Sequence, residues 1–390
     1  SNGLEKRPKL RFPGFDEPYK QCRIGDIYAE RSQRGASDME LLSVTMNDGV
    51  KPRSEIEGKD NSSEDKSNYK IVRKGDMVYN SMRMWQGANG ISPCDGIVSP
   101  AYTVLMPKQE INNGYFAALF KSVTLINEFR KNSQGMTSDT WNLKYPQIET
   151  IKVQIPSVSE QNKVSELFSV LDERIATQAQ LVESLKKYKR GLLSQLIAQK
   201  KAFDTSGEWK TVKLGHIFKE RTERAKGNET LLAVTISNGV QRRDEIDLKD
   251  NSSDDKSNYK CVYIGDIAYN TMRMWQGASG VSPYNGIVSP AYTIVTPIRP
   301  DLHNMTFWAY YFKYSPLVQT FQKYSQGLTS DTWNLKFPQF SEIAVTMPPI
   351  SEQDKIAECL SVFDEHCKCE DEKLQALLQV RTSLLQQLFI

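Results

Sequence analysis

The sequence is short of the residues and loops that a self-contained enzyme needs. It has only three histidines in 390 residues, too dispersed to support a catalytic triad: His216, His303 and His366. No Walker-type phosphate loop is present, because residues 58–60 read Gly-Lys-Asp. Residues 16–19 (DEPY) come nearest to the D/N-P-P-aromatic loop of amino-methyltransferases, but they lack the central proline. The sequence therefore predicts no catalytic residues.

Metal-binding clusters are equally scarce. The six cysteines form no C-x-x-C pair, as expected for the reduced thiols of a cytoplasmic protein. Residues 366–369 (HCKC) offer three ligands, whereas zinc sites need four, so Cys367 is better explained as a buried thiol. A nuclease-like acidic set begins at Asp48, but position 238, its counterpart in the repeat described below, is asparagine. We therefore expect no metal site.

Long apolar runs and an excess of one charge are also missing. No run approaches the length of a membrane span and no signal peptide is visible, so we expect no membrane association. The 50 basic and 47 acidic residues leave a net charge of +3, so composition alone does not demand a nucleic-acid partner. Residues 1–3 resemble the remnant of a cleaved tag and are set aside.

The strongest feature that is present is an internal repeat. Residues 60–103 match residues 250–293, a shift of 190 residues, with 33 of the 44 aligned positions identical. Further along, residues 133–146 (SQGMTSDTWNLKYP) match residues 325–338 (SQGLTSDTWNLKFP) at a shift of 192. A unit of this size predicts two globular domains rather than a solenoid.

The two copies have diverged unevenly. Residues 108–131 and 298–323 barely resemble each other, whereas the retained segments are rich in polar residues that packing alone would allow to change. One interpretation is that both copies retain the polar segments because these segments have a function. The alternative is a recent duplication followed by patchy recombination.

Each copy ends in a long heptad-like stretch. Apolar residues recur at alternating spacings of four and three, which is typical of a coiled-coil seam. The seam positions are Val164, Phe168, Leu171, Ile175, Val182, Leu185, Leu192 and Leu196, and then Ile356, Leu360, Phe363, Cys367, Leu374, Leu377, Leu384 and Leu388. Helices of roughly 36–40 residues span about 55–60 Å. We expect them to pair antiparallel, the alternative being that each packs on its own globular domain.

The helix starts and the globular parts can also be predicted locally. Ser159 and Ser351 are the expected N-caps, each followed by Glu-Gln. Short β-like runs at residues 69–72, 77–79, 101–105 and 148–155, with single helices at residues 113–129 and 305–321, indicate an α+β fold.

This layout resembles the specificity subunit (HsdS) of Type I restriction–modification systems. The motifs are GDMVYNSMRMWQG (residues 75–87) with GDIAYNTMRMWQG (265–277), and IPSVSEQ (155–161) with MPPISEQ (347–353). The resemblance covers nearly the whole chain. It implies an α+β fold of two pseudo-symmetric globular target-recognition domains, residues 4–156 and 201–348, separated by two long antiparallel coiled-coil helices, residues 157–200 and 349–390.

The resemblance also implies partners and cofactors. Each domain would read one half of a bipartite site in double-stranded DNA. Two modification (methyltransferase) subunits would bring S-adenosylmethionine to an adenine, and restriction (motor-nuclease) subunits would use ATP and Mg²⁺ for cleavage. The chain itself would bind no cofactor. The alternatives are a self-contained methyltransferase or nuclease, and a coiled-coil adaptor that reads no DNA.

Three retained polar segments supply the candidate DNA contacts. Arginine typically reads guanine, asparagine and glutamine read adenine, and lysine and hydroxyl groups bind phosphate. We name them the arginine segment (residues 80–87 and 270–277), the threonine segment (133–144 and 325–336) and the lysine segment (66–68 and 256–258). The candidates are Asn80, Arg83, Trp85, Gln86, Asn270, Arg273, Trp275, Gln276, Thr137, Ser138, Thr140, Lys144, Thr329, Ser330, Thr332, Lys336, Lys66, Asn68, Lys256 and Asn258, with Asp139 and Asp331 beside them.

Each candidate also has a structural interpretation. Asparagine and serine can simply hold turns, Trp85 and Trp141 can belong to the core, and Arg83 can pair with a nearby carboxylate. Because the two copies share nearly all of these residues, we expect an interrupted palindrome or a site close to one. If residues 108–131 and 298–323 also touch bases, the halves will differ.

Overall fold

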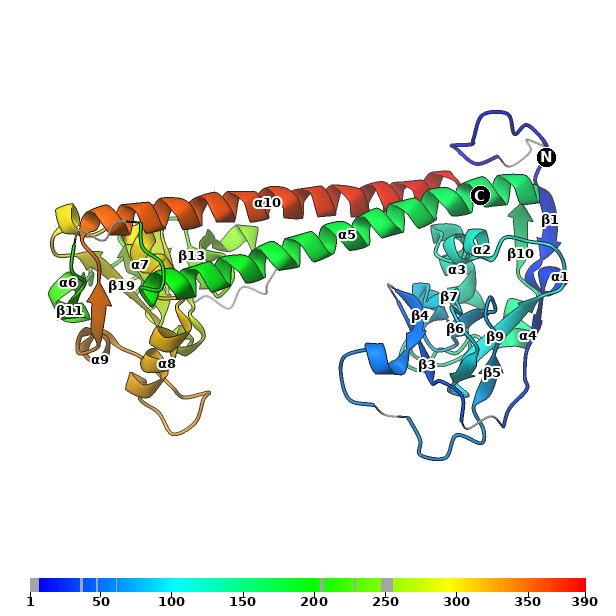
Figure 1. Cartoon of the computed structure of the whole chain (residues 1–390), viewed down its shortest axis with the longest axis horizontal. Helices are drawn as coiled ribbons and strands as arrows, with labels where there is room; N and C mark the ends of the chain where they lie inside the picture. Colours follow the sequence, from blue (N-terminus) through cyan, green and yellow to red (C-terminus); the bar gives the residue numbers. More distant parts are fainter. Residues whose placement is uncertain are drawn as a thin grey trace. The chain divides into compact units, whose positions relative to one another are not determined.

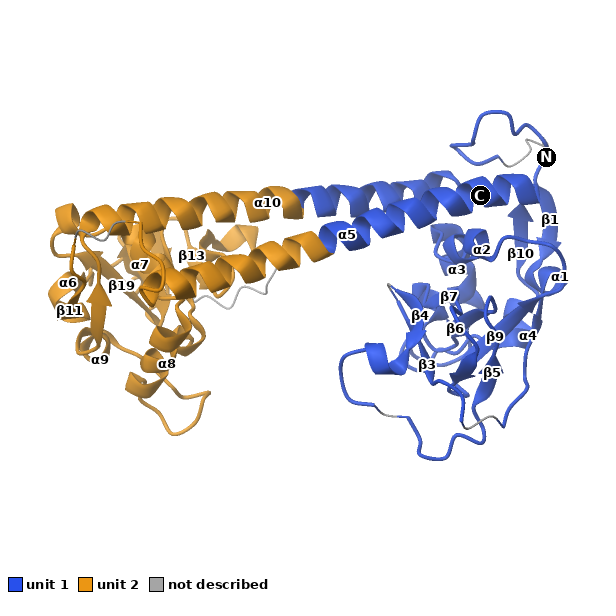
Figure 2. Cartoon of the chain, in the orientation of Figure 1, with its two compact units in different colours: residues 1–179, 372–390 blue, residues 180–371 orange. Residues whose placement is uncertain are grey.

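The computed structural model describes residues 7–35, 38–46, 48–60, 62–203, 207–227, 229–246 and 255–390. The chain folds into two compact units, one made of Ser1–Ala179 with Glu372–Ile390 and the other of Gln180–Asp371 (Figure 2). Residues 1–3 and residues 250–254, where the repeat continues in the second copy, lie outside the described residues.

The elements of the first unit are drawn in Figure 1, with labels where there is room. In chain order they are β1 (Lys20–Arg23), α1 (Ile24–Ile27), β2 (Tyr28–Glu30), β3 (Leu42–Thr45), β4 (Gly49–Pro52), η1 (Arg53–Glu55), β5 (Lys70–Val72), β6 (Met77–Asn80), η2 (Met84–Gln86), β7 (Asn89–Ile91), β8 (Gly96–Val98), β9 (Tyr102–Pro107), α2 (Asn113–Leu119), α3 (Val123–Asn132), α4 (Tyr145–Ile148) and β10 (Lys152–Ile155).

The second unit repeats this order. Its elements are β11 (Lys210–Lys213), α6 (Leu214–Ile217), β12 (Phe218–Glu220), β13 (Leu232–Thr235), β14 (Gly239–Arg242), η3 (Arg243–Glu245), β15 (Lys260–Val262), β16 (Ile267–Asn270), η4 (Met274–Gln276), β17 (Ser279–Val281), β18 (Gly286–Val288), β19 (Tyr292–Pro297), η5 (Pro300–Leu302), α7 (Met305–Tyr311), α8 (Ser315–Tyr324), α9 (Phe337–Ser341) and β20 (Ala344–Met347). The long helices α5 (Val158–Ile197) and α10 (Ile350–Gln387) contribute residues to both units.

A four-stranded antiparallel sheet lies at the centre of each unit. Its strand order is β2-β9-β6-β7 in the first unit and β12-β19-β16-β17 in the second. Successive side chains of a strand point to opposite faces, and both faces are buried here. On β6, Met77 and Tyr79 join the core that contains the helices, whereas Val78 joins a second, smaller core with Val104. The predicted α+β class is confirmed.

The long helices run antiparallel to each other within each unit. In the first unit Phe168 stacks on Phe389 and Asp172 pairs with Arg381. In the second unit Lys189 pairs with Asp364. The two ion pairs are equivalent under the 192-residue shift of the repeat. The predicted antiparallel pairing is confirmed.

Each globular unit also packs on the seam of both helices. Val164 of α5 and Leu388 of α10 lie in the core of the first unit, and Leu196 and Leu360 lie in the core of the second. Cys367 is buried among the seam positions, as predicted. Antiparallel pairing of the helices and packing of the helices on the globular domains, the two arrangements considered from the sequence, therefore occur together.

The Glu-Gln pair at each helix start fastens the helix to its unit. Gln161 is 1% exposed, accepts a 3.0 Å hydrogen bond from the Asn112 amide and donates one of 3.0 Å to the Pro156 carbonyl. Gln353 makes the equivalent bonds with the Asn304 amide and the Pro348 carbonyl, both at 3.0 Å. The Ser-Glu-Gln sequence that both copies retain therefore has a structural role at this junction.

Three local predictions were wrong. The helices begin at Val158 and Ile350, two residues earlier than N-caps at Ser159 and Ser351 would place them, so both serines lie inside the first turn. Residues 148–155 are not one strand, because α4 occupies Tyr145–Ile148 before β10. Residues 113–129 and 305–321 each form two helices. Ser122 caps the second helix in the first copy, and a proline occupies its first turn in the other.

Candidate nucleic-acid interface

The arginine segment is a tight turn at the end of β6. The Asn80 side-chain oxygen accepts a 3.0 Å hydrogen bond from the Met82 amide, and the Trp85 indole N–H donates to the Met82 carbonyl at 3.0 Å. Met84 is fully buried beneath the turn, and Gly87 ends it in the left-handed conformation, with φ of 84°. The second copy has the same two bonds to Met272. Asn80 and Trp85 therefore hold the shape of the turn.

Arg83 points out of this turn without a protein partner. Its side chain is exposed, and none of the described carboxylates forms an ion pair with it. Its counterpart Arg273 is also exposed and makes one side-chain bond, a 3.3 Å contact with the Gln276 amide oxygen. Gln86 is half-buried beside Arg83. These donors are available to an external acceptor.

The threonine segment is a loop closed by its own backbone. Gln134 and Asn142 bond each other through their amides and carbonyls, and the Thr140 amide donates to the Thr137 carbonyl at 2.9 Å. Gly135 allows the close approach of the two sides, because an added Cβ would lie 2.6 Å from the Thr140 carbonyl oxygen. Ser138 and Lys144 are exposed. The hydroxyls of Thr137 and Thr140 lie 3.4 Å apart.

The tip of this loop carries an apolar side chain that sequence reasoning passed over. Met136 is 99% exposed, and its counterpart Leu328 is 101% exposed. Their sequence signal was the apolar position inside an otherwise polar, retained segment.

The structure brings the arginine and threonine segments together in each unit. The Leu143 amide donates a 2.8 Å hydrogen bond to the Ser81 carbonyl, and the rings of Trp85 and Trp141 meet edge to face at 5.2 Å. In the second unit the Leu335 amide bonds Thr271 at 2.9 Å, and Trp275 meets Trp333 at 5.2 Å. Segments about 50 residues apart in the chain therefore form one continuous polar surface.

The lysine segment of the first unit bonds within its own loop. The Lys66 ammonium donates to the Ser63 carbonyl at 3.2 Å, inside its own loop. No hydrogen bond or ring contact among the described residues joins Lys66 or Asn68 to the other two segments. In the second unit the Lys256 ammonium lies 6.0 Å from the Tyr259 ring centre, and Asn258 is exposed.

Arg130 belongs to the surface although the sequence did not single it out. It lies in the last turn of α3, which packs against η2, and its guanidinium is 5.5 Å from the centre of the Trp85 ring. The prediction selected residues retained in both copies, and Arg130 falls in the stretch that has drifted.

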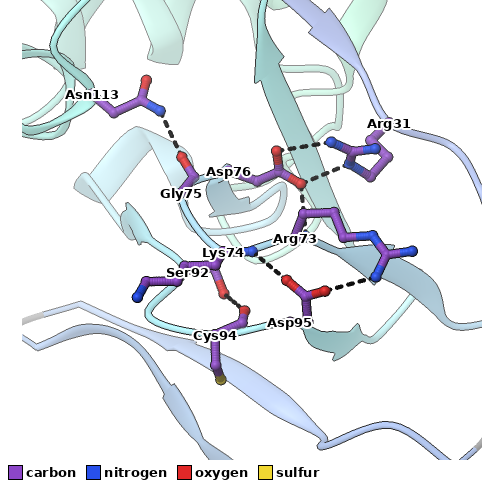
Figure 3. Close-up of polar contacts among 9 residues, drawn as sticks. All are labelled: Arg31, Arg73, Lys74, Gly75, Asp76, Ser92, Cys94, Asp95 and Asn113. Carbon is purple, nitrogen blue, oxygen red and sulfur yellow. Dashed lines mark hydrogen bonds and ion pairs between the residues drawn. The ribbon is translucent and has the colours of Figure 1, made fainter.

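Other polar residues that both copies retain stabilise the fold of each unit. Asp76 is 4% exposed and binds Arg31 through two hydrogen bonds of 2.7 and 3.1 Å, while accepting the Arg73 amide at 2.9 Å (Figure 3). Hydrogen bonding to Asp76 raises the pKa of Arg31. Arg221 and Asp266 repeat the pair at 2.7 and 3.0 Å. The Gly-Asp motif is therefore structural.

The described residues hold no group of three or more His, Cys, Asp or Glu side chains placed to bind a metal ion. Among the same residues, no helix is both long and apolar enough to span a membrane.

The fold and the surface together define a duplicated α+β protein built on two long helices. A model described as the Type I restriction modification DNA specificity domain matches residues 17–187 and, a second time, residues 206–379. The chain therefore belongs to the family of Type I restriction–modification DNA specificity subunits.

Individual relatives agree with this assignment. The chain is 28% identical over 184 residues to the Type I restriction enzyme MjaVIII specificity subunit of Methanocaldococcus jannaschii, a match that covers 44% of this chain and only 41% of that protein. The crystal structure of a Type I S subunit from M. genitalium superposes with a TM-score of 0.59 at 15% identity, over 99% of each chain. An HsdS subunit from Thermoanaerobacter tengcongensis gives 0.51 at 15% identity, also over 99% of each chain. At these identities the two structures show a shared fold.

The structural role of Asp76 can be tested against its neighbour Asp95. The Asp76→Ala change leaves Arg31 and the Arg73 amide without their acceptor, so we expect the free energy of unfolding to fall by about 3 kcal/mol or more. Asp95→Ala removes a half-exposed partner of Arg73 (Figure 3) and should cost less than about 1 kcal/mol. Chemical denaturation of the full-length variants measures both. Equal losses would contradict the structural assignment.

Proposed function

We propose that this chain is the DNA-reading subunit of a Type I restriction–modification enzyme and recognises a bipartite site in double-stranded DNA. One observation carries the proposal. In each unit an exposed arginine, Arg83 or Arg273, which forms no ion pair with a described carboxylate, stands on a surface formed by two retained polar segments. Membership of the specificity-subunit family supports it.

The proposed contacts divide by chemistry. Arg83 and Arg273, with Gln86 and Gln276, would face base edges, because their donors reach outside the turn. Hydroxyl and ammonium groups would bind the phosphate backbone. In the first copy these are Thr137, Ser138, Thr140, Lys144 and Lys66, and in the second copy they are Thr329, Ser330, Thr332, Lys336 and Lys256. Asn80, Trp85, Asn270 and Trp275 shape the turn, and Asn68 and Asn258 complete the set of proposed contacts.

We further propose that catalysis and cofactors belong to partner subunits. Two modification subunits would supply S-adenosylmethionine chemistry on adenine, and restriction subunits would supply ATP- and Mg²⁺-dependent cleavage. The chain would work in the cytoplasm, where the DNA of a bacterial or archaeal cell lies. The long paired helices would set the distance between the half-sites, and the likeness of the two units would make those half-sites an interrupted near-palindrome.

Incubation of the purified chain with labelled S-adenosylmethionine and DNA tests the non-catalytic role. We expect no incorporation of label and no cleavage, because the sequence lacks the loops that would hold the cofactor. The matched positive reaction contains the modification subunits as well. Methylation by the chain alone would contradict the proposal.

Removing one candidate reader tests the surface directly. Arg83→Ala and Arg273→Ala should each weaken binding of the chain to its cognate DNA site by about 1–3 kcal/mol, the value of one bidentate base contact. Arg174→Ala, an exposed arginine on α5, is the control and should bind as the wild type does. Gel-shift titrations at low and high salt measure both, since phosphate contacts make binding fall with salt.

The outcomes separate the alternatives. A folded Arg83→Ala variant with wild-type affinity would refute the assignment of Arg83. Absence of salt-dependent binding by the wild-type chain would favour an adaptor that reads no DNA.

The proposed ruler role of the helices predicts a change in spacer length. Inserting one heptad into both α5 and α10 adds about 10 Å of helix, or roughly three base pairs at about 3.4 Å each. Sequencing of methylated sites in cells that carry the altered subunit measures the spacer. A folded, active variant with an unchanged spacer would rule this role out.

A further inference from the structure

The two units differ at an exposed position beside the shared surface, which is Arg130 in the first copy and Gln322 in the second. Both residues precede the threonine segment by the same interval. The Ser133 amide donates to the Arg130 carbonyl at 3.3 Å, and the Ser325 amide donates to the Gln322 carbonyl at 3.2 Å. The two side chains therefore leave equivalent points of helices α3 and α8.

The backbone around this position is fixed in both units. The Ser133 hydroxyl donates to the Phe129 carbonyl at 2.7 Å, and the Ser325 hydroxyl donates to the Phe321 carbonyl at 2.8 Å. Phe129 and Phe321 are fully buried. Helix α3 packs against η2 and helix α8 against η4, the short helices of the arginine segments. The backbone that presents the side chain at this point is therefore the same in both units.

Both side chains are available to a ligand. Arg130 is exposed, and no hydrogen bond or ion pair holds its guanidinium to any described residue. Its guanidinium carbon lies 5.5 Å from the centre of the Trp85 ring, and none of its N–H donors is used in a hydrogen bond to a described residue. The neighbouring Glu128 is engaged by Lys131 at 2.7 Å. Gln322 is likewise exposed, with no described hydrogen-bond partner for its amide.

The difference in chemistry has a consequence for base choice. Arginine donates two hydrogen bonds to guanine O6 and N7, whereas glutamine pairs with adenine N6 and N7. We propose that Arg130 and Gln322 read the position at which the two half-sites differ, Arg130 selecting guanine and Gln322 selecting adenine. This inference rests on the proposed DNA-reading function.

Selection of binding sites from a random double-stranded DNA pool tests the inference with the full-length chain. The wild type should select an interrupted inverted repeat that carries guanine in one half and adenine at the mirror position. Arg130→Gln should convert guanine to adenine and make the site symmetric. Gln322→Arg should make it symmetric with guanine. Each variant should lose about 5- to 150-fold in affinity for the wild-type site.

Two controls separate base reading from other roles. Lys131→Gln changes a neighbouring exposed cation that is lysine in both copies (Lys323), so base preference should stay as in the wild type. Arg130→Lys keeps the charge but lacks the planar fork, so it should weaken the guanine preference without replacing it by adenine. Thermal unfolding of each variant verifies that it is folded.

Several results would overturn the inference. Arg130→Gln could select the same bases as the wild type, or weaken all sequences equally with a smaller salt dependence, which would mark Arg130 as a phosphate contact. A loss of stability without a change of base in either Arg130→Gln or Gln322→Arg would mark the position as structural. If the wild type selects no sequence at all, the proposed function fails first.

Discussion

The hydrogen bond from the Leu143 amide to the Ser81 carbonyl, with the Trp85–Trp141 contact beside it, is the constraint on which the candidate surface depends. It joins a turn at the end of β6 to a loop that begins after α3. Together with the packing of α3 against η2, it holds the arginine and threonine segments against each other. The same bond and ring pair recur in the second unit, so one geometry presents the candidate readers twice.

Retained polar residues divide into two groups once burial is known. Asp76 and Gln161 are buried and make their hydrogen bonds inside the protein, where an unmade bond would cost about 1–3 kcal/mol. Arg83 and Lys144 are exposed, and neither side chain forms a hydrogen bond or ion pair with another described residue. Stability explains why the first group is kept. Among the described residues the second group has no such role, and the proposed contact with DNA would explain why it is kept.

Local patterns predicted the parts that are local. Heptad spacing identified the seam, including Cys367, and a short β-like run identified the strand at Met77. The break between α7 and α8 carried a signal in Pro316, which the predicted helix over residues 305–321 ignored. Nothing in the sequence distinguished the structural Asp76 from the exposed Arg83, because both are retained and their burial depends on distant strands. Arg130 was not predicted because the candidates were residues that both copies retain, and this residue lies where the copies differ.

The two units share their exposed segments and differ in the stretches that carry Arg130 and Gln322, so they should read nearly the same bases in opposite orientation. Sequencing of methylated adenines in a cell that contains this subunit and its partners tests this claim most directly. The expected site is an interrupted inverted repeat whose halves agree at most positions. Two half-sites with no inverted similarity would contradict the claim, and would show that the retained segments are structural while the drifted stretches carry the specificity.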